Sequence, residues 1–353
     1  MEKSPNQFSD LWCEKYSISI NSAKFSVANA SEKKMPRSHV IKKDTFHYLW
    51  NRSHKPVLNI KPGDRVHFEV NEVYSGQISP KTKVEELPTL DGSKLYPMAG
   101  PVYVEGAEPG DALIVNVESV KPANWGWSAI MPPFGLLEEF TTPYLHIWNL
   151  RGSKRYANFV KRIQVPLNPF CGVLGVAPPE EGSFEVMPPG KHGGNMDVRH
   201  LISGSTVLLP VWNEGALFST SDVHATQGDG EVCVTAIECP GDVTITFDLK
   251  KSANLQTPCY YSRPLNESRS GYFGTTGISP DLMTASKQAV RGMVSFLEKN
   301  LDISREQAYI LCSVAGELRI HEIVDAPNWV VGMMMSRSMI KEESRRPGNR
   351  RRN

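Results

Sequence analysis

The sequence predicts a mainly β fold: a sandwich or barrel-like core with a smaller C-terminal α+β part. Glycine and proline are both frequent, with 27 and 26 of 353 residues, which favours short strands joined by turns over long helices. A Pro-Gly-Asp turn that leads into an alternating apolar strand occurs three times, at residues 62–64, 109–111 and 240–242. Between roughly residues 55 and 250 no helix-length apolar period interrupts this pattern.

The overall composition is that of an ordinary globular protein. Hydrophobic residues make up 40% and charged residues 22% of the chain, and the formal net charge is +1. This balance gives no reason to expect a nucleic acid or a membrane as partner. No apolar run approaches the roughly 20 residues that span a bilayer, and the N-terminus lacks a signal-peptide pattern. Six scattered cysteines without a CxxC pair predict reduced thiols in a cytoplasmic protein.

Taken in order, the chain divides into four expected parts. Residues 1–38 are a polar N-terminal extension with one strand-like run at 16–20. Residues 39–278 form the β-rich core, which carries the candidate site. Residues 279–335 form a helical α+β segment, and residues 336–353 a basic tail that we expect to be disordered.

Local signals define the C-terminal segment. Ser279-Pro280 predicts an N-cap and first helical position, followed by apolar residues at helical spacing. Ser304 and Gln307 predict a capping box for a second helix, which should end near Gly316. A strand is expected at 318–325.

The candidate site is a polar, glycine-rich cluster framed by strand-like runs, at residues 191–197 and 221–231. Catalytic and binding residues usually lie on loops that a rigid scaffold of secondary structure positions. The first stretch contributes His192, Asn195 and Asp197, and the second contributes Asp222, His224, Gln227, Asp229 and Glu231.

The spacing of Asp222 and His224 points both side chains to one face of a strand. An imidazole nitrogen and a carboxylate oxygen can begin a metal site, and Asp197 is the natural third ligand from the other loop. Three protein ligands leave a position for water, whose pKa a divalent metal such as zinc lowers to roughly 7. Asp-x-His pairs also occur as plain hydrogen-bonded structure, so both interpretations stay open.

The remaining polar residues have candidate roles around such a metal. Glu231 or Asp229 could act as general base, and Asn195, Gln227 and loop amides could hold an oxyanion or a small amide. His192 is a further candidate for substrate binding, with exposure to solvent as the alternative. Residues 228–230 also fit a hairpin turn.

Motifs of other enzyme classes are missing. The sequence has no GxSxG elbow, no Walker sequence, no HExxH and no dinucleotide fingerprint. We expect Cys233 to be packed on an alternating strand at 232–238, which argues against a cysteine nucleophile. Residues 121–150 are rich in aromatic residues and loop-like, and fit a lid, a pocket wall, core packing or an oligomer contact.

The central motifs resemble the acetamidase/formamidase family. Their sequences are Pro-Pro-Gly-Lys-His-Gly-Gly-Asn-Met-Asp at 188–197, Gly-Ala-Leu-Phe at 215–218 and Asp-Val-His-Ala-Thr-Gln-Gly-Asp-Gly-Glu-Val at 222–232. Residues 100–111 and 172–178 are also similar, and the likeness covers roughly residues 40–335. The resemblance implies a mainly β fold and hydrolysis of a short aliphatic amide, formamide or acetamide, to the carboxylic acid and ammonia.

The same resemblance implies a homo-oligomer, a dimer or higher, and a divalent metal, zinc, at the central cluster. The matching positions are Asp197, Asp222, His224 and Glu231, with ligand and base among them left open. The sequence departs from the usual pattern at Tyr96 and Ala99, which replace a histidine and a threonine. A larger or cyclic amide substrate is therefore one alternative, and a non-catalytic β-scaffold that binds a small ligand is another.

Overall fold

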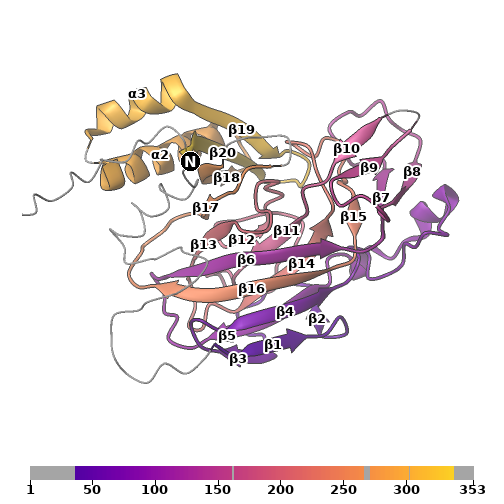
Figure 1. The fold of residues 1–353 in the computed structure, drawn as a ribbon, viewed down its shortest axis with the longest axis horizontal. Helices are drawn as coiled ribbons and strands as arrows, with labels where there is room; N and C mark the ends of the chain where they lie inside the picture. Colours follow the sequence, from indigo (N-terminus) through magenta and orange to yellow (C-terminus); the bar gives the residue numbers. More distant parts are fainter. Residues whose placement is uncertain (1–35, 161–162, 266–270, 302, 338–353) are drawn as a thin grey trace, which may run out of the picture.

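The computed structural model describes residues 36–160, 163–265, 271–301 and 303–337 (Figure 1). The strand-like run at 16–20 and residues 338–353 of the basic tail lie outside the described residues. Strands dominate the described chain, and its two long helices lie near the C-terminal end, so the predicted mainly β fold with a C-terminal α+β part is confirmed.

The first sheet has nine strands, and only the pair at its β1 edge is parallel. Its strands come from the beginning, middle and end of the described chain, so the C-terminal strands continue the same sheet as the core strands. In spatial order they are β1 (Ser38–Ile41), β4 (Arg65–Val70), β16 (Gly241–Lys250), β6 (Ala112–Pro122), β13 (Thr206–Pro210), β17 (Cys259–Tyr261), β18 (Tyr272–Ser279), β20 (Trp329–Ser336) and β19 (Gly316–Glu322).

The second sheet carries the predicted site stretches. Its main path runs through β12 (Gly193–Asn195), β11 (Phe170–Gly175), β14 (Phe218–His224), β15 (Glu238–Cys239), β7 (Trp125–Ile130) and β8 (Tyr144–Asn149). Strand β5 (Met98–Val104) also pairs with β14, and in turn pairs with β2 (Phe46–His47) and β3 (Leu58–Ile60). The pair β9 (Tyr156–Asn158) and β10 (Gln164–Pro166) stands apart, and two 3₁₀ helices, η1 (Val84–Thr89) and η2 (Gly92–Lys94), precede β5.

The two sheets share one apolar core. Phe68 and Phe247 of the first sheet pack against Phe218 of the second, and the ring centroids of Phe218 and Phe247 lie 4.9 Å apart. Full burial of an aromatic side chain contributes about 1.5–3 kcal/mol. This interdigitation of two inner faces makes the core a β-sandwich and holds β14 rigidly at its centre.

The Pro-Gly-Asp turns connect the layers. The turn at 62–64 carries the chain from β3 in the second sheet to β4 in the first, with φ of 93° at Gly63. The Asp64 carboxylate accepts hydrogen bonds from the backbone N–H groups of Lys61, at 3.0 Å, and Arg37, at 2.9 Å. This aspartate therefore serves the turn rather than a chemical site.

Helix α2 (Leu282–Leu301) packs on β18 and β20, and α3 (Arg305–Ala315) packs against α2 and β19; together they bury a second apolar cluster (Figure 1). The capping box of Ser304 and Gln307 is confirmed. The predicted start at Ser279-Pro280 is wrong by two residues, because Ser279 ends β18 and the Asp281 carboxylate accepts the N–H of Thr284 at 2.7 Å. Neither helix has the length and apolarity that crossing a bilayer requires.

Candidate functional site

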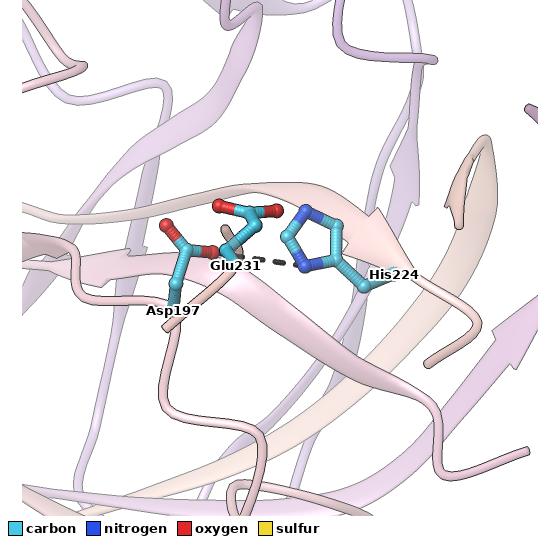
Figure 2. Close-up of side chains that lie close together, drawn as sticks. All are labelled: Asp197, His224 and Glu231. Carbon is cyan, nitrogen blue, oxygen red and sulfur yellow. Dashed lines mark ion pairs between the residues drawn. The ribbon is translucent and has the colours of Figure 1, made fainter. Parts of the chain in front are cut away.

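The two predicted stretches meet at the buried imidazole of His224 (Figure 2). The Nε2 atom of His224 lies 3.2 Å from Oδ2 of Asp222 and 3.1 Å from Oε2 of Glu238. Its Nδ1 atom lies 3.6 Å from Oδ1 of Asp197, and Figure 2 shows Glu231 converging on the same side. We call these five residues the His224 cluster; two groups within it, Asp197–His224–Glu231 and Asp222–His224–Glu238, have the spacing of metal ligands.

Neighbouring strands of the second sheet position the cluster. Asp222 and His224 are two residues apart at the end of β14, and Glu238 of β15 is the register partner of His224. Asp197 follows β12, which pairs with β11, and β11 pairs with β14. The side chains therefore come from three separate parts of the chain, and sheet register brings them together.

Gly172 of β11 leaves the space into which these side chains point. A Cβ atom at this position would lie 2.4 Å from Oδ1 of Asp197 and 2.8 Å from Oδ2 of Asp222. It would also lie 3.0 Å from Cε1 of His224. Both carboxylates consequently border one small gap that only glycine keeps open.

Three members of the His224 cluster hold strained backbone conformations. Asp197, Asp222 and Glu231 have φ of 48°, 59° and 46°. Left-handed conformations at non-glycine residues cost of order 1–3 kcal/mol each and gather at functional sites. Asp222 adopts its conformation inside a strand, which aims its carboxylate at the imidazole.

The electrostatics of the cluster reflect an excess of buried carboxylates. Burial, reinforced by Asp222, raises the pKa of Asp197 to about 6 despite the opposing effect of His224. Burial raises the pKa of Glu238 to about 8, and it raises the pKa of Glu231 well above its usual range with help from Asp197. Burial opposes protonation of His224, but Glu238 and Asp222 outweigh it and leave the pKa of the imidazole well above normal.

Several oxygens of the cluster lack hydrogen-bond partners among the described residues. They include both carboxylate oxygens of Asp197, Oδ1 of Asp222 and Oε2 of Glu238. Buried carboxylates that neither pair nor hydrogen-bond are costly, and a bound cation is a common way to satisfy them. The nitrogen and oxygen donors are those that zinc and other divalent metals accept, so the residues fit a metal ion.

Gln227 fixes the orientation of the imidazole. Its Oε1 lies 2.9 Å from Nδ1 of His224, and its Nε2 donates to the backbone oxygen of Asp197 at 3.0 Å. An amide oxygen only accepts, so Nδ1 carries the proton in this bond and Nε2 is left to face Asp222 and Glu238. A hydrogen bond to the ring nitrogen that does not bind the metal usually fixes the tautomer of a metal-ligating histidine in this way.

The C-terminal part adds two further buried carboxylates, Glu322 and Asp325. Oδ2 of Asp325 accepts a hydrogen bond from Nδ2 of Asn195 at 2.6 Å, and Oε1 of Glu322 accepts from the N–H of Asp325 at 2.6 Å. Sequence reasoning missed both residues, along with Glu238. An acidic residue at the end of the apolar run 232–237, close to the predicted site, is a usable signal for Glu238, whereas no spacing in the sequence connects residue 325 to residue 195.

Two predicted site residues are not brought into the cluster. Asp229 forms an ion pair with Arg319 at 3.0 Å, where its side chain is 28% exposed. His192 is buried against the ring of Trp50, at 5.1 Å between centroids. It lines a separate cavity of about 1260 Å³ beside α2 and β18, whose lining includes no member of the His224 cluster.

The segments around Glu231 differ from expectation. A strand at 232–238 is wrong, because φ of 46° at Glu231 and 71° at Val234 break the extended backbone, and only Glu238–Cys239 is strand. Cys233 is exposed rather than packed. Residues 121–150 form the β7–β8 hairpin, and the loop at its tip contacts this segment through the N–H of Leu136 and the oxygen of Val232, 2.9 Å apart.

Known proteins are similar to this chain in sequence and in fold. The chain is 25% identical to a formamidase of Methylophilus methylotrophus over 80% of this chain and 86% of that protein. Its structure is similar to the crystal structure of an acetamidase from Bacillus halodurans, with a TM-score of 0.77 and 30% identity, covering 85% of this chain and 98% of the other. An acetamidase from Yersinia enterocolitica gives a TM-score of 0.78 at 31% identity, with 88% and 95% covered. The sequence model of the Acetamidase/Formamidase family matches residues 34–185 and 180–341, and the chain therefore belongs to this family.

Proposed function

We propose that the protein hydrolyses a short aliphatic amide, formamide or acetamide, to the carboxylic acid and ammonia at the His224 cluster. The observation that carries this proposal is a buried imidazole paired with several carboxylates, some of whose oxygens have no hydrogen-bond partner among the described residues, in a chain of the Acetamidase/Formamidase family. Its relatives named above are a formamidase and acetamidases.

The His224 cluster would hold a divalent metal, and we propose zinc. The sequence predicts His224, Asp222 and Asp197 as the ligands. Ligand spacing in the structure groups Glu238 with Asp222 and His224, and groups Asp197 with His224 and Glu231. When bound, the metal would supply a Lewis acid that polarises the amide and acidifies water. Gln227 would keep the imidazole in the tautomer that this role requires.

We assign proton transfer to Glu231. It is buried beside Asp197, and Figure 2 shows its carboxylate beside the imidazole of His224. Burial raises the pKa of this carboxyl, so the ionised form that a neighbouring cation would favour is a stronger base than that of an exposed glutamate. In this assignment Glu231 takes a proton from the attacking water as the water oxygen bonds to the carbonyl carbon. It then delivers that proton to the nitrogen as the C–N bond breaks, and ammonia leaves. Asp229 is the second candidate for this step, but its ion pair with Arg319 favours a role in holding the loop.

The enclosure of the site favours small substrates. All five residues of the His224 cluster are more than nine-tenths buried, as are Asn195 and Gln227, which we propose border the substrate. A non-catalytic scaffold would have no reason to gather so many buried carboxylates around one imidazole, on strained backbone, at considerable energetic cost.

The direct test is release of ammonia by the full chain from an amide panel that runs from formamide and acetamide to lactams. We expect activity on the two smallest amides, loss of it after chelation and recovery on addition of zinc. Unchanged activity after complete metal removal would overturn the metal assignment, and no turnover of any short amide by metal-loaded protein would overturn the function.

We also propose that the protein is a cytoplasmic homo-oligomer, a dimer or higher. The five cysteines among the described residues are free thiols. Near the β7–β8 hairpin and the β9–β10 pair, the apolar side chains of Phe134, Leu137, Phe140 and Ile163 are 48%, 51%, 51% and 54% exposed. Large exposed apolar patches mark association surfaces. Light scattering on the purified chain gives the test, and a monomer at micromolar concentration would contradict the proposal.

A further inference from the structure

Tyr96 lies just before β5, a strand that pairs with β14. Its backbone N–H donates to the oxygen of Val73 at 2.8 Å, and only 9% of the residue is exposed. Its hydroxyl lies 3.3 Å from Nδ2 of Asn195, the residue whose amide also bonds to Asp325. The tyrosine side chain thus ends in the polar interior of the site.

The backbone of Tyr96 is strained, with φ of 55°. Bulky side chains rarely adopt this left-handed conformation, and it costs of order 1–3 kcal/mol. Such strain persists where surrounding structure fixes it, and here the backbone bond to Val73 and the place of Tyr96 in a buried apolar cluster with Trp50, Met98 and Val173 do so. The conformation has the effect of aiming the hydroxyl at Asn195.

The hydrogen bonds of Tyr96 and Asn195 leave one donor, the hydroxyl hydrogen of Tyr96, and one acceptor, Oδ1 of Asn195, available for a further group. Nδ2 of Asn195 carries two hydrogens. It donates to Asp325 at 2.6 Å, and the hydroxyl of Tyr96 and the oxygen of Met187, each at 3.3 Å, are the acceptors within reach of its other hydrogen. The Tyr96 oxygen therefore acts as acceptor in this bond, which leaves its own hydrogen available for another group. Oδ1 of Asn195 is buried and has no hydrogen-bond partner among the described residues.

A primary amide carries the complementary pair, a carbonyl oxygen that accepts and an N–H that donates, joined through one carbon. We propose that Tyr96 and Asn195 together bind the amide group of the substrate, with the Tyr96 hydroxyl donating to the carbonyl oxygen and Asn195 Oδ1 accepting an amide N–H. This inference rests on the proposed function and adds Tyr96 to it as a catalytic residue.

The surroundings keep the Tyr96 hydroxyl a donor. Burial raises its pKa well above 10, and the negative charges of Asp325, Asp222, Asp197 and Glu231 raise it further. The hydroxyl thus stays protonated across the working range of an amidase. A fixed donor aimed at an oxygen that gains negative charge in the transition state is worth about 10²–10³-fold in kcat.

The test compares Tyr96→Phe with Tyr48→Phe in the full-length, metal-loaded protein. The hydroxyl of Tyr48 bonds to Ser75 at 3.1 Å, outside the His224 cluster, so its removal controls for the loss of a tyrosine hydroxyl. For acetamide hydrolysis we expect Tyr96→Phe to lower kcat about 100-fold with a much smaller change in KM. Metal content and melting temperature should match wild type, and Tyr48→Phe should have wild-type kinetics.

The outcomes separate the two proposals. If wild type hydrolyses acetamide and Tyr96→Phe keeps its kcat within threefold, the amide-binding role of Tyr96 is wrong while the proposed function stands. A Tyr96→Phe protein that loses its metal would likewise overturn the role, because the hydroxyl would then act through the cluster and not on substrate. If metal-loaded wild type turns over no short amide, the function itself fails and this inference fails with it.

Discussion

Arg319 of β19 lies 3.0 Å from Asp229, from its Nη1 to the carboxylate Oδ2, and this ion pair ties the C-terminal strand to the loop that carries Glu231. The N–H of Gly230 donates to the backbone oxygen of His321 at 3.0 Å, one residue from Glu231. Glu317 holds the guanidinium from the other side, accepting from Nε of Arg319 at 2.9 Å. The C-terminal part therefore positions the proposed base and supplies two buried carboxylates to the same region.

The first prediction concerns this ion pair. Arg319→Ala should lower kcat for acetamide several-fold, because the loop that carries Glu231 loses a tether, while stability should fall by at most about 1 kcal/mol, as for partly exposed pairs. The control is Arg65→Ala, which removes a similarly exposed pair with Glu118 at 2.8 Å on the first sheet. Kinetics and thermal melting measure both. Equal kinetic effects of the two variants would contradict a positioning role for Arg319.

A second prediction separates the two candidate bases. Glu231→Gln should lower kcat by about 10²–10⁴-fold, the range for loss of a general acid–base group, with metal still bound. Asp229→Asn should lower kcat only as far as Arg319→Ala does, since both break the same ion pair. Steady-state kinetics with elemental analysis gives the answer. A larger loss in Asp229→Asn than in Glu231→Gln would transfer the role of base to Asp229.

Metal content provides a third prediction, specific to individual ligands. Asp197→Ala and His224→Ala should be the most damaging changes, with loss of both zinc and activity. Glu238→Gln should also lower bound zinc per chain, because its Oε2 has no other partner among the described residues and lies 3.1 Å from His224. Elemental analysis of folded protein is the measurement. Wild-type zinc and turnover in Asp197→Ala and His224→Ala would show that the site lies elsewhere.

The sequence predicts the parts of this site that depend on local geometry. Asp222 and His224 are two residues apart on one strand, and this spacing predicts that their side chains share a face. The left-handed backbone at Asp222, which the sequence does not show, completes the orientation of its carboxylate. The places of Glu238 and Asp325 in the site depend instead on strand register and on the path of the C-terminal strands. Residue spacing in the sequence predicts neither. Apolar alternation after Glu231 predicts a strand there. It cannot reveal the left-handed conformations at Glu231 and Val234, which make this segment a loop.

The pH dependence of the metal-free protein gives a fourth prediction. Burial raises the pKa of Asp197 to about 6 and of Glu238 to about 8, above their unfolded values, so between about pH 4 and 8 the folded state binds more protons than the unfolded state. The raised pKa of His224 acts in the same direction. Buried histidines with lowered pKa values, such as His192 and His321, act in the opposite direction below about pH 6.5. Stability of chelated protein should therefore fall as pH rises from about 6.5 to 8, and added zinc should raise the melting temperature more at pH 8 than at pH 6.5. A chelated protein that becomes more stable over this interval would contradict this charge balance.

Gly172 provides the last prediction, because its missing side chain forms the gap of the site. In Gly172→Ala the new methyl would lie 2.4 Å from Oδ1 of Asp197 and 2.8 Å from Oδ2 of Asp222, and neither carboxylate can retreat without leaving the imidazole. Such overpacking costs about 1–3 kcal/mol, and we expect loss of bound zinc together with loss of activity. The matched control is Gly92→Ala in η2, where a new Cβ meets nothing within 4 Å. If Gly172→Ala binds zinc as wild type does, the ion does not occupy this gap, and Asp197 and Asp222 cannot both be its ligands.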